Sequence, residues 1–384
     1  MIDYLLTEEQ IMVRDLSRQI ADEKIRPAAA EYDRTEEFPW DVVKAMAQSD
    51  MFGVYIEEKY GGMGGGVMEL CLATEEFSRG CAGIALAFAA TALGTFPLIL
   101  FGSDAQKMKY LPAIARGEKL AAFGLTEPGA GSDAGAIQTV AEKKGDRYVL
   151  NGVKHFITNG GEAEIYTIIA MTDRSKGPRG ASLFLVEKDT PGFTFGKKED
   201  KMGIRASSTR ELVFDNCEIP QENLLGREGQ GFIAAMKTFD MSRPGVGAQA
   251  LGIAQAALDE SIKYAKQRKQ FGKPISSFQG IQWMLADMAT QVEAARALVY
   301  ASAREIDAGR KNVGVHSAMG KMYASDVAMK VATDAVQIFG GYGYMKEYPV
   351  EKFMRDAKIT QIYEGTNQIQ RNIIALGLIK ETAR

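Results

Sequence analysis

The stretch 148-YVLNGVKHFITNGG-161 interrupts a chain whose remaining parts have mostly helical character. Tyr, Val, Ile, Phe and Thr dominate this stretch, and these residue types favour strands. Asn151-Gly152 lies in its middle and is typical of a two-residue hairpin turn, where both positions need positive φ. The stretch therefore predicts two strands, over residues 148–150 and 153–157, joined by that turn.

The chain divides into three zones around this stretch. Further strand-prone runs follow at 166–171, 182–186 and 212–214, each bounded by turn residues. Before them, a Thr7-x-x-Gln10 capping box predicts the start of a helix. After Gly231 the helical period persists, as in the apolar stripe Leu251, Ala254, Leu258, Ile262 and Ala265. We predict a mainly α fold with a middle β domain: an N-terminal helical domain at 1–120, the β domain at 121–230 and a four-helix bundle at 231–384.

Composition limits the classes of partner. The 384 residues carry 46 Lys and Arg against 49 Asp and Glu, a net charge of -3, without a basic block for nucleic acid or a polybasic tail for a membrane. Three cysteines and two histidines show no metal-ligand spacing, so no metal site is expected, and His155 and His316 are interpreted as structural. The first residues lack a leader pattern, which predicts a cytoplasmic protein.

One uncharged stretch, residues 80–103, is long enough for a membrane span. Gly83, Gly94 and Pro97 interrupt it, and its many alanines suit close packing between helices. We therefore interpret it as a core helix of a soluble protein.

The run 129-GAGSDA-134 matches the residue pattern of a dinucleotide-binding fingerprint but not its structural context. That fingerprint needs a preceding strand and a following helix, whereas Pro128 precedes this run and strand-prone residues follow it. Gly129 and Gly131 still allow backbone amides to approach a phosphate closely, with Ser132 as a further donor. A plain glycine-rich turn is the alternative.

Five motifs in order resemble acyl-CoA dehydrogenases over essentially the whole chain: 125-LTEPGAGSD-133, 156-FITNGG-161, 268-RKQFGKPISSFQ-279, 337-QIFGGYGY-344 and 347-EYPVEKFMRDAKITQIYEGTNQIQR-371. The resemblance implies an N-terminal helical domain, a β-barrel-like middle domain and a C-terminal four-helix bundle. It also implies FAD as cofactor, an acyl-CoA substrate, an electron-transfer flavoprotein as partner and a homotetramer in fatty acid β-oxidation.

The resemblance identifies Glu364 as the general base that removes an α-proton from the thioester while a hydride leaves the β-carbon. An acid between Tyr363 and Gly365, shut off by bound substrate, has the raised pKa that such a base needs. A helix-capping acid is the alternative from spacing alone. Ser132, Asp240, Arg243, Tyr363 and Gly365 are implied on the substrate side.

The residues implied in FAD binding come from all three zones. They are Phe123, Leu125, Thr126, Gly131, Ser132, Phe156, Ile157, Thr158, Arg268, Phe271, Gln279, Gln337, Gly341, Thr366 and Gln368. Several of these positions are donated by a neighbouring subunit in the family. Phe156 replaces the tryptophan common at its position.

The sequence is compatible with more than one acyl group. Gly252 together with the retained Glu364 resembles the straight-chain, short- to medium-chain group that includes butyryl-CoA dehydrogenases. The alanines of 84-IALAFAATALG-94 leave a branched or alicyclic acyl group, such as cyclohexanecarbonyl, as an alternative. An enoyl-CoA reductase using the same site is a second alternative, and a non-catalytic CoA-ester binding protein is a third.

Overall fold

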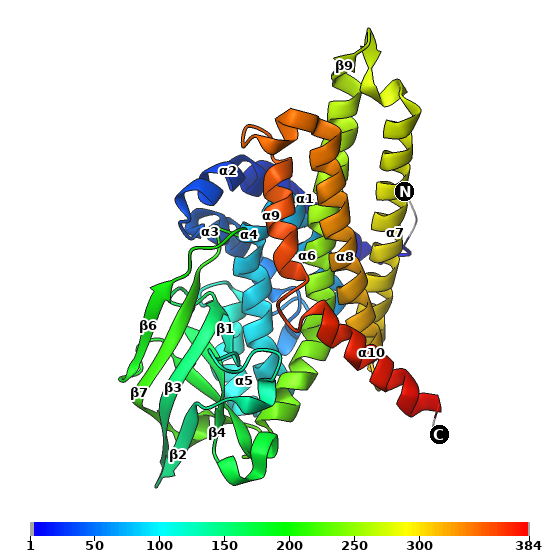
Figure 1. Cartoon of the computed structure of the whole chain (residues 1–384). Helices are drawn as coiled ribbons and strands as arrows, with labels where there is room; N and C mark the ends of the chain where they lie inside the picture. The colour runs from blue at the N-terminus through cyan, green and yellow to red at the C-terminus, as the bar shows by residue number, and fades with distance from the viewer. Residues whose placement is uncertain (1–3, 383–384) are drawn as a thin grey trace.

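The computed structural model describes residues 4–382, and its elements follow the three predicted zones (Figure 1). The N-terminal helices are α1 (Glu8–Ile20), α2 (Arg26–Thr35), α3 (Trp40–Gln48), α4 (Val67–Phe101) and α5 (Asp104–Ala115). The Thr7 hydroxyl accepts from the amide of Gln10, and the Gln10 side chain accepts from Thr7, so the predicted capping box is confirmed.

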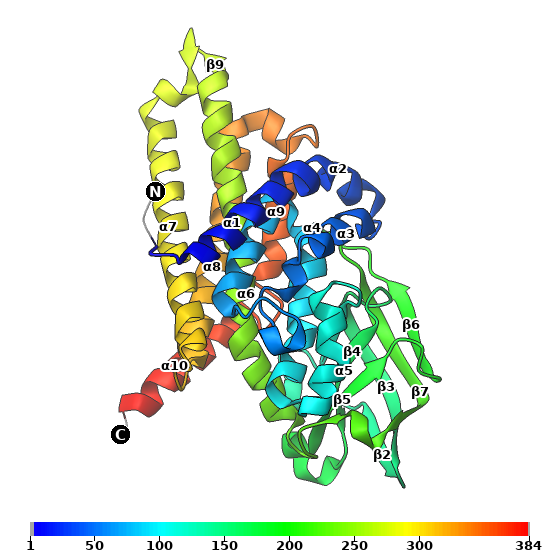
Figure 2. The same ribbon diagram turned by 180° about the vertical axis from the view of Figure 1, so that it is seen from behind.

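The middle zone is a single eight-stranded sheet. Its strands are β1 (Ala121–Gly124), β2 (Val140–Lys144), β3 (Arg147–Thr158), β4 (Ile165–Met171), β5 (Ala181–Glu187), β6 (Phe193–Lys198), β7 (Thr209–Pro220) and β8 (Leu224–Leu225). They are ordered β6-β7-β3-β2-β4-β5-β8, with β1 added parallel to β4. Figure 2 shows this sheet to one side of the helices, with α5 against it.

The predicted hairpin at Asn151-Gly152 is wrong. β3 runs through both residues, and the turn that joins β2 to β3 is Gly145-Asp146. Gly152 lies at a register shift between β3 and β7, with φ +144, where an added Cβ would lie 2.7 Å from the Cα of Thr139. The glycine allows β3 to pass close to Thr139, so the Asn-Gly pattern reflects an irregularity within the strand and no turn.

The C-terminal zone is built from long helices. They are α6 (Gly231–Gln267), α7 (Gln279–Asp307), α8 (Gly314–Phe339), α9 (Val350–Thr360) and α10 (Asn367–Thr382), with a short ribbon of β9 (Lys269–Gln270) and β10 (Lys273–Pro274) between α6 and α7. The α6 stripe is buried except for Ile262, which is 40% exposed near the end where α6 and α7 project beyond the body (Figure 1). The predicted fold class is confirmed; the boundaries after residues 120 and 230 remain predictions, and residues 1–3 and 383–384 of the outer domains lie outside the described part.

Helix α4 is the apolar helix that the sequence singled out. By length and composition it is the only helix among residues 4–382 that could cross a membrane, yet 72% of its most apolar window is buried inside the fold. It packs along α6, and at Gly94 an added Cβ would lie 2.5 Å from the backbone of Ala122. The predicted close packing is confirmed, although the helix breaks at Cys81 (φ -165, ψ 116) and not at the glycines or Pro97.

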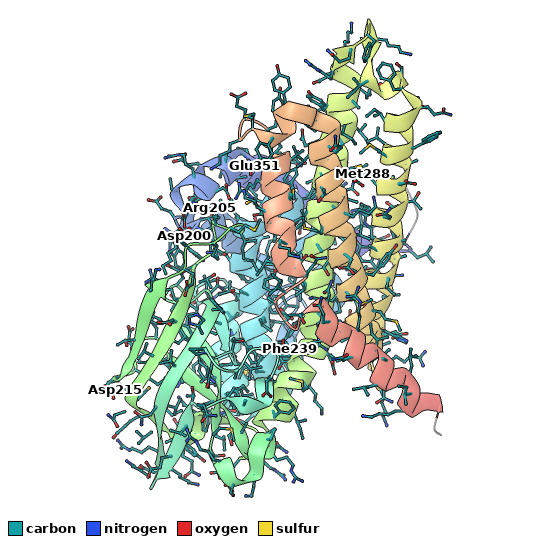
Figure 3. All side chains as sticks on the ribbon, in the orientation of Figure 1. Asp200, Arg205, Asp215, Phe239, Met288 and Glu351 are labelled. Atoms are coloured by element: carbon teal, nitrogen blue, oxygen red, sulfur yellow. The ribbon has the colours of Figure 1, made fainter. Side chains whose placement is uncertain are left out.

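The three zones are joined by charged contacts at one corner, where Figure 3 labels Asp200, Arg205 and Glu351. Arg205 donates to the backbone oxygen of Asp33 in α2 at 2.9 Å. Arg355 of α9 bridges the Asp33 carboxylate at 2.8 Å and Glu351 at 2.7 Å. These contacts fix the sheet and α9 relative to the N-terminal helices, and α9 leads directly into the 361–366 loop.

Candidate active site

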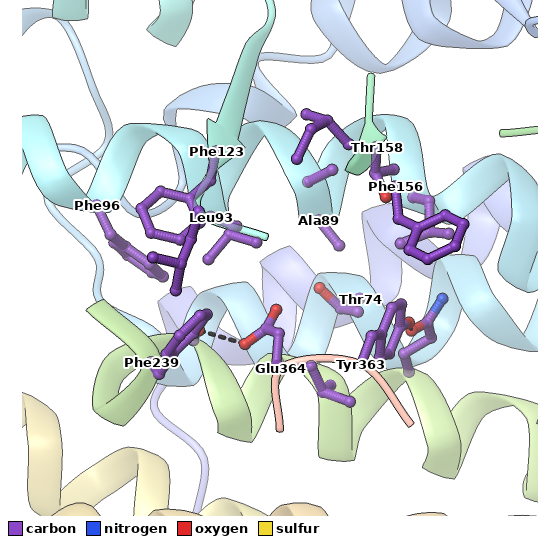
Figure 4. Close-up of a pocket in the computed structure, with 18 of the residues that line it drawn as sticks. Thr74, Ala89, Leu93, Phe96, Phe123, Phe156, Thr158, Phe239, Tyr363 and Glu364 are labelled. Atoms are coloured by element: carbon purple, nitrogen blue, oxygen red, sulfur yellow. Dashed lines mark hydrogen bonds between the residues drawn. The ribbon is translucent and has the colours of Figure 1, made fainter. Parts of the chain in front are cut away.

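A cavity lies between α4, α6, the sheet and the loop after α9 (Figure 4). α4 supplies Leu70, Thr74, Leu86, Ala89, Ala90, Leu93 and Phe96, and α6 supplies Phe239, Ser242, Gly245, Val246 and Gln249. The sheet and its following loop supply Phe123, Leu125, Thr126, Phe156, Ile157 and Thr158, and the loop after α9 supplies Tyr363 and Glu364. The wall is mostly apolar, with a few polar groups, which is the usual character of a small-molecule site.

Glu364 is held in the cavity wall by an unusual backbone. Its φ is +52 and that of Gly365 is +90, so the chain turns through the left-handed region at both residues. The side-chain Nε2 of Gln370 donates to the carbonyl oxygens of Glu364 at 3.1 Å and of Gly365 at 2.8 Å. Strain of this kind persists only where surrounding contacts fix it, and it occurs often at functional sites.

Among the described residues, the Glu364 carboxylate has one hydrogen-bond partner, the hydroxyl of Ser242, which donates to Oε2. Burial raises the pKa of Glu364 above its usual value, while Ser242, Arg243 and Lys321 act to lower it. A carboxylate with a raised pKa beside an apolar cavity has the properties of a general base for carbon acids.

Lys321 of α8 is hydrogen-bonded to the loop that carries Glu364. Its side chain is fully buried and donates to the Gly365 oxygen and to Oδ1 of Asn367, both at 2.9 Å. Burial lowers the pKa of Lys321 to about 7. Sequence reasoning missed Ser242 and Lys321 because neither belongs to a motif with a spacing that marks it.

The substrate-side predictions Asp240 and Arg243 lie on α6 beside the Glu364 loop and outside the cavity lining. Arg243 is buried, pairs with Asp240 at 3.2 Å and approaches the Glu364 carbonyl oxygen at 3.4 Å. Tyr363 lines the cavity and donates its hydroxyl to the side chain of Gln249. Gln249 was also missed, although it is the one large polar residue within 245-GVGAQALGIA-254.

A buried ion pair organises the glycine-rich loop. Lys154 of β3 pairs with Glu127 at 2.7 Å and donates to the Leu125 oxygen at 3.1 Å. Glu127 also accepts from the amide of Thr139 at 3.0 Å. Burial lowers the pKa of Lys154 to about 8, against the attraction of Glu127. The loop is thereby fixed with Gly131 and Ser132 exposed.

Apart from Gly131 and Ser132 on the exposed glycine-rich loop, the predicted FAD residues lie in three separate places within one chain. Phe123, Leu125, Thr126, Phe156, Ile157 and Thr158 line the cavity. Arg268, Phe271, Gln279, Gln337 and Gly341 belong to the far end of the bundle, where Arg268 stacks 5.3 Å from the ring centroid of Tyr342. Thr366 and Gln368 line a surface depression at the start of α10. A single chain does not bring these sets together.

The chain matches three family models in succession: the acyl-CoA dehydrogenase N-terminal domain at 7–118, the middle domain at 122–217 and the C-terminal domain at 229–379. The chain belongs to the acyl-CoA dehydrogenase family. Family membership confirms the predicted oxidoreductase class and the dependence on FAD.

Three similar proteins extend this assignment. The structure of butyryl-CoA dehydrogenase from Megasphaera elsdenii is 51% identical, with a TM-score of 0.96, covering 98% of this chain and 100% of that one. A chain in the structure of the electron transferring flavoprotein of Acidaminococcus fermentans is 51% identical, with a TM-score of 0.97 and coverage of 99% and 100%. Acryloyl-CoA reductase (NADH) of Anaerotignum propionicum is 49% identical and covers 99% of this chain and 96% of its own length.

The residues of this acyl-CoA dehydrogenase fit a flavin beside the cavity. An added Cβ at Gly129 or Gly131 would meet nothing within 4 Å, so packing within the chain does not require these glycines and their backbone is open to a ligand. Phe156 is 60% exposed with φ +60, an aromatic ring held at the cavity mouth by strained backbone.

Among residues 4–382, no three His, Cys, Asp or Glu side chains form a metal-ligand group.

Proposed function

We propose that Glu364 is the base that removes the α-proton during acyl-CoA dehydrogenation. The position of its carboxylate carries this proposal, because it lies in the cavity wall with a raised pKa and is oriented by Ser242. Bound FAD supplies the acceptor for the hydride that leaves the β-carbon. The protein's own task is to place Cα of the ester next to Glu364 and to exclude water from the carboxylate.

The backbone at Glu364 supports a second part of this mechanism. Among the described residues, the Glu364 amide has no acceptor, although the neighbouring carbonyls are bonded by Gln370 and Lys321. A free N–H next to the base is suited to the thioester carbonyl, where negative charge develops as the α-proton leaves. We assign it that role.

We propose a short acyl chain as substrate. Gln249 and Tyr363 are hydrogen-bonded to each other in the cavity wall, so two large side chains restrict the space for an acyl chain there. The likeness to a butyryl-CoA dehydrogenase supports a four-carbon ester. Ala89 and Ala90 leave width on the α4 side, which keeps a branched or alicyclic ester such as cyclohexanecarbonyl-CoA as the second candidate.

For electron transfer we propose an electron-transfer flavoprotein as partner, in the cytoplasm and in β-oxidation. The near-complete match to the chain from the Acidaminococcus fermentans structure supports this partner. The match to acryloyl-CoA reductase supports the opposite direction, enoyl-CoA reduction at the same site, as an alternative.

We also propose that a neighbouring copy completes the FAD site, in a homotetramer. The three separated sets of predicted FAD residues support this, because one chain cannot surround one cofactor with all of them. Phe271 at the bundle end is 91% exposed and Trp283 nearby is 62% exposed, as expected for residues that another copy covers.

The direct test is anaerobic bleaching of the bound flavin with butyryl-, octanoyl-, isobutyryl-, glutaryl- and cyclohexanecarbonyl-CoA. We expect butyryl-CoA to bleach it fastest. Glu364→Gln should bind FAD and ester yet lose bleaching by about a thousandfold or more, because the base acts in the transition state. Glu347→Gln, an exposed acid in the preceding loop, is the matched control. Normal bleaching by Glu364→Gln would refute the assignment, and bleaching by no ester would favour the reductase direction.

A further inference from the structure

Thr74 places an unsatisfied hydroxyl in the cavity wall. It lies on the first half of α4, is 0% exposed, and lines the cavity with Leu70, one turn before it (Figure 4). A buried hydroxyl on a helix commonly donates to the carbonyl four residues earlier. Thr91 and Thr95 of the same helix do so, each at 2.7 Å. The Thr74 hydroxyl has no partner among the described residues.

The break in α4 and a glycine on α6 explain why Thr74 faces open space. The backbone departs from the helix at Cys81, between Thr74 and the second group of lining residues. Opposite Leu70, an added Cβ at Gly245 would lie 3.7 Å from Leu70 Cδ2, so the glycine leaves room there. Gly245 follows Ser242 by one turn, about 4.5 Å along the axis. This part of the cavity is therefore displaced by about one turn of α6 from the Ser242 contact that holds the Glu364 carboxylate.

The side chains that line the cavity indicate which kind of ligand group would pair with the Thr74 hydroxyl. Apart from Glu364, the side chains that line the cavity in the described chain are uncharged. A carboxylate on the ligand would be buried near Glu364 with no cation in the cavity lining, at a high desolvation cost. A neutral oxygen would instead satisfy the Thr74 hydroxyl, whose burial without a partner is unfavourable.

We propose that Thr74 is a recognition point for a neutral oxygen, a hydroxyl or a carbonyl, carried on the acyl chain beyond its β-carbon. This inference rests on the proposed function, because it places an acyl chain in the cavity. It assigns the enzyme an oxygenated short-chain ester among its substrates, in addition to the simple alkyl ester.

The experiment compares isosteric pairs of esters in the FAD-loaded protein. The pairs are 4-hydroxybutyryl-CoA with pentanoyl-CoA, and 5-hydroxypentanoyl-CoA with hexanoyl-CoA. The readout is the ratio of kcat/KM within each pair, for the wild type, Thr74→Val and Thr74→Ser. Thr91→Val is the control, because Thr91 is a buried threonine of the same helix whose hydroxyl already donates to Ala87.

We expect Thr74→Val to lower the hydroxyl-to-alkyl ratio about five- to tenfold in at least one pair, the size of one hydrogen bond. Thr74→Ser should retain the wild-type ratio, and Thr91→Val should leave it unchanged. Equal ratios in wild type and Thr74→Val for both pairs would overturn the proposal. So would a loss of several degrees in Tm for ligand-free Thr74→Val, since that would show a protein partner for the hydroxyl.

Failure of the proposed function is distinguishable from failure of this inference. If the wild type oxidises neither butyryl-CoA nor any alkyl ester, the proposed function fails. The same pairs are then compared by equilibrium binding in a calorimeter. A five- to tenfold loss of the affinity ratio in Thr74→Val would still support the Thr74 subsite, and an unchanged ratio would refute it.

Discussion

The Ser242 hydroxyl donates to the Glu364 carboxylate across 122 residues of sequence. Ser242 lies on α6 and Glu364 on the loop after α9, so their contact depends on the packing of α9 against α6 and α8. The hydrogen bond stabilises the charged form of the carboxylate, while burial favours the neutral form. These two opposing effects, burial and the hydrogen bond from Ser242, together set the pKa of the proposed base.

Ser242→Ala should therefore raise the pKa of Glu364. The acidic limb of the kcat/KM profile should move to higher pH by about one unit, because less of the base is ionised at a given acidic pH. Steady-state rates with butyryl-CoA from pH 5 to 9 measure this shift. Ser242→Thr retains the hydroxyl and should restore the wild-type profile. A profile that is unmoved in Ser242→Ala would mean that the hydrogen bond has no influence on the base.

Lys321 should leave a signature in the pH dependence of stability. Its folded pKa of about 7 lies below the ordinary value of 10.5, so between these values the unfolded chain binds one more proton than the folded one. The contribution of Lys321 to the free energy of unfolding is least favourable below pH 7 and rises with pH by up to about 1.4 kcal/mol per unit. Urea unfolding of wild type and Lys321→Met from pH 6 to 10 should show this rise in the wild type alone.

The same Lys321→Met variant should also lose activity at every pH, because the Gly365 carbonyl loses a donor and the Glu364 turn is less firmly fixed. Lys330→Met on the same helix, an exposed lysine paired with Asp334, is the control.

For the stability prediction, parallel unfolding curves for wild type and Lys321→Met across the pH range would contradict the assigned pKa.

Gln249 should limit the length of the acyl chain. Gln249→Gly removes the side chain that accepts from Tyr363 and deepens the cavity. We expect the ratio of kcat/KM for octanoyl-CoA over butyryl-CoA to rise at least about tenfold, since each added buried methylene contributes about 0.8 kcal/mol. Gln267→Ala, at the exposed end of α6, serves as control. An unchanged ratio would place the floor of the pocket elsewhere.

Lys154 and Glu127 should be energetically coupled, because each buried charge compensates the other. Lys154→Met leaves Glu127 as an uncompensated buried charge and should cost about 3–5 kcal/mol in the free energy of unfolding. FAD content should also fall, because the 125–133 loop loses its anchor. The double variant Lys154→Met/Glu127→Gln should recover a large part of the stability, as measured by denaturant unfolding. Additive losses in the double variant would argue against coupling of the two charges.

Phe271 tests the proposed assembly. Phe271→Asp places a charge on a side chain that is 91% exposed in the single chain, so a monomer would tolerate it. If another copy covers this residue, the variant should lose both the tetramer and most of its FAD. Sedimentation velocity and the flavin-to-protein absorbance ratio measure the two together. Lys269→Asp in the adjacent ribbon controls for charge alone, and a flavinated tetramer of Phe271→Asp would refute the proposed contact.

The sequence by itself predicted the order of helical, β and helical zones, because the 3.6-residue and two-residue periods of buried side chains are local properties. It also predicted Glu364, through a motif that is continuous in the chain. It misread Asn151-Gly152, since a glycine with positive φ occurs both in hairpin turns and at irregularities within a strand, and only the pairing of β3 with β7 distinguishes them.

Tertiary structure alone decided the surroundings of Glu364. Ser242, Lys321, Gln249 and Thr74 come from three helices, and none of them belongs to a motif with a spacing that marks it. Their importance arises from burial, because a hydroxyl or an ammonium group affects a carboxylate or a ligand strongly only where water is excluded. Which side chains share such a space depends on the packing of α4, α6 and α8, and no local pattern encodes it.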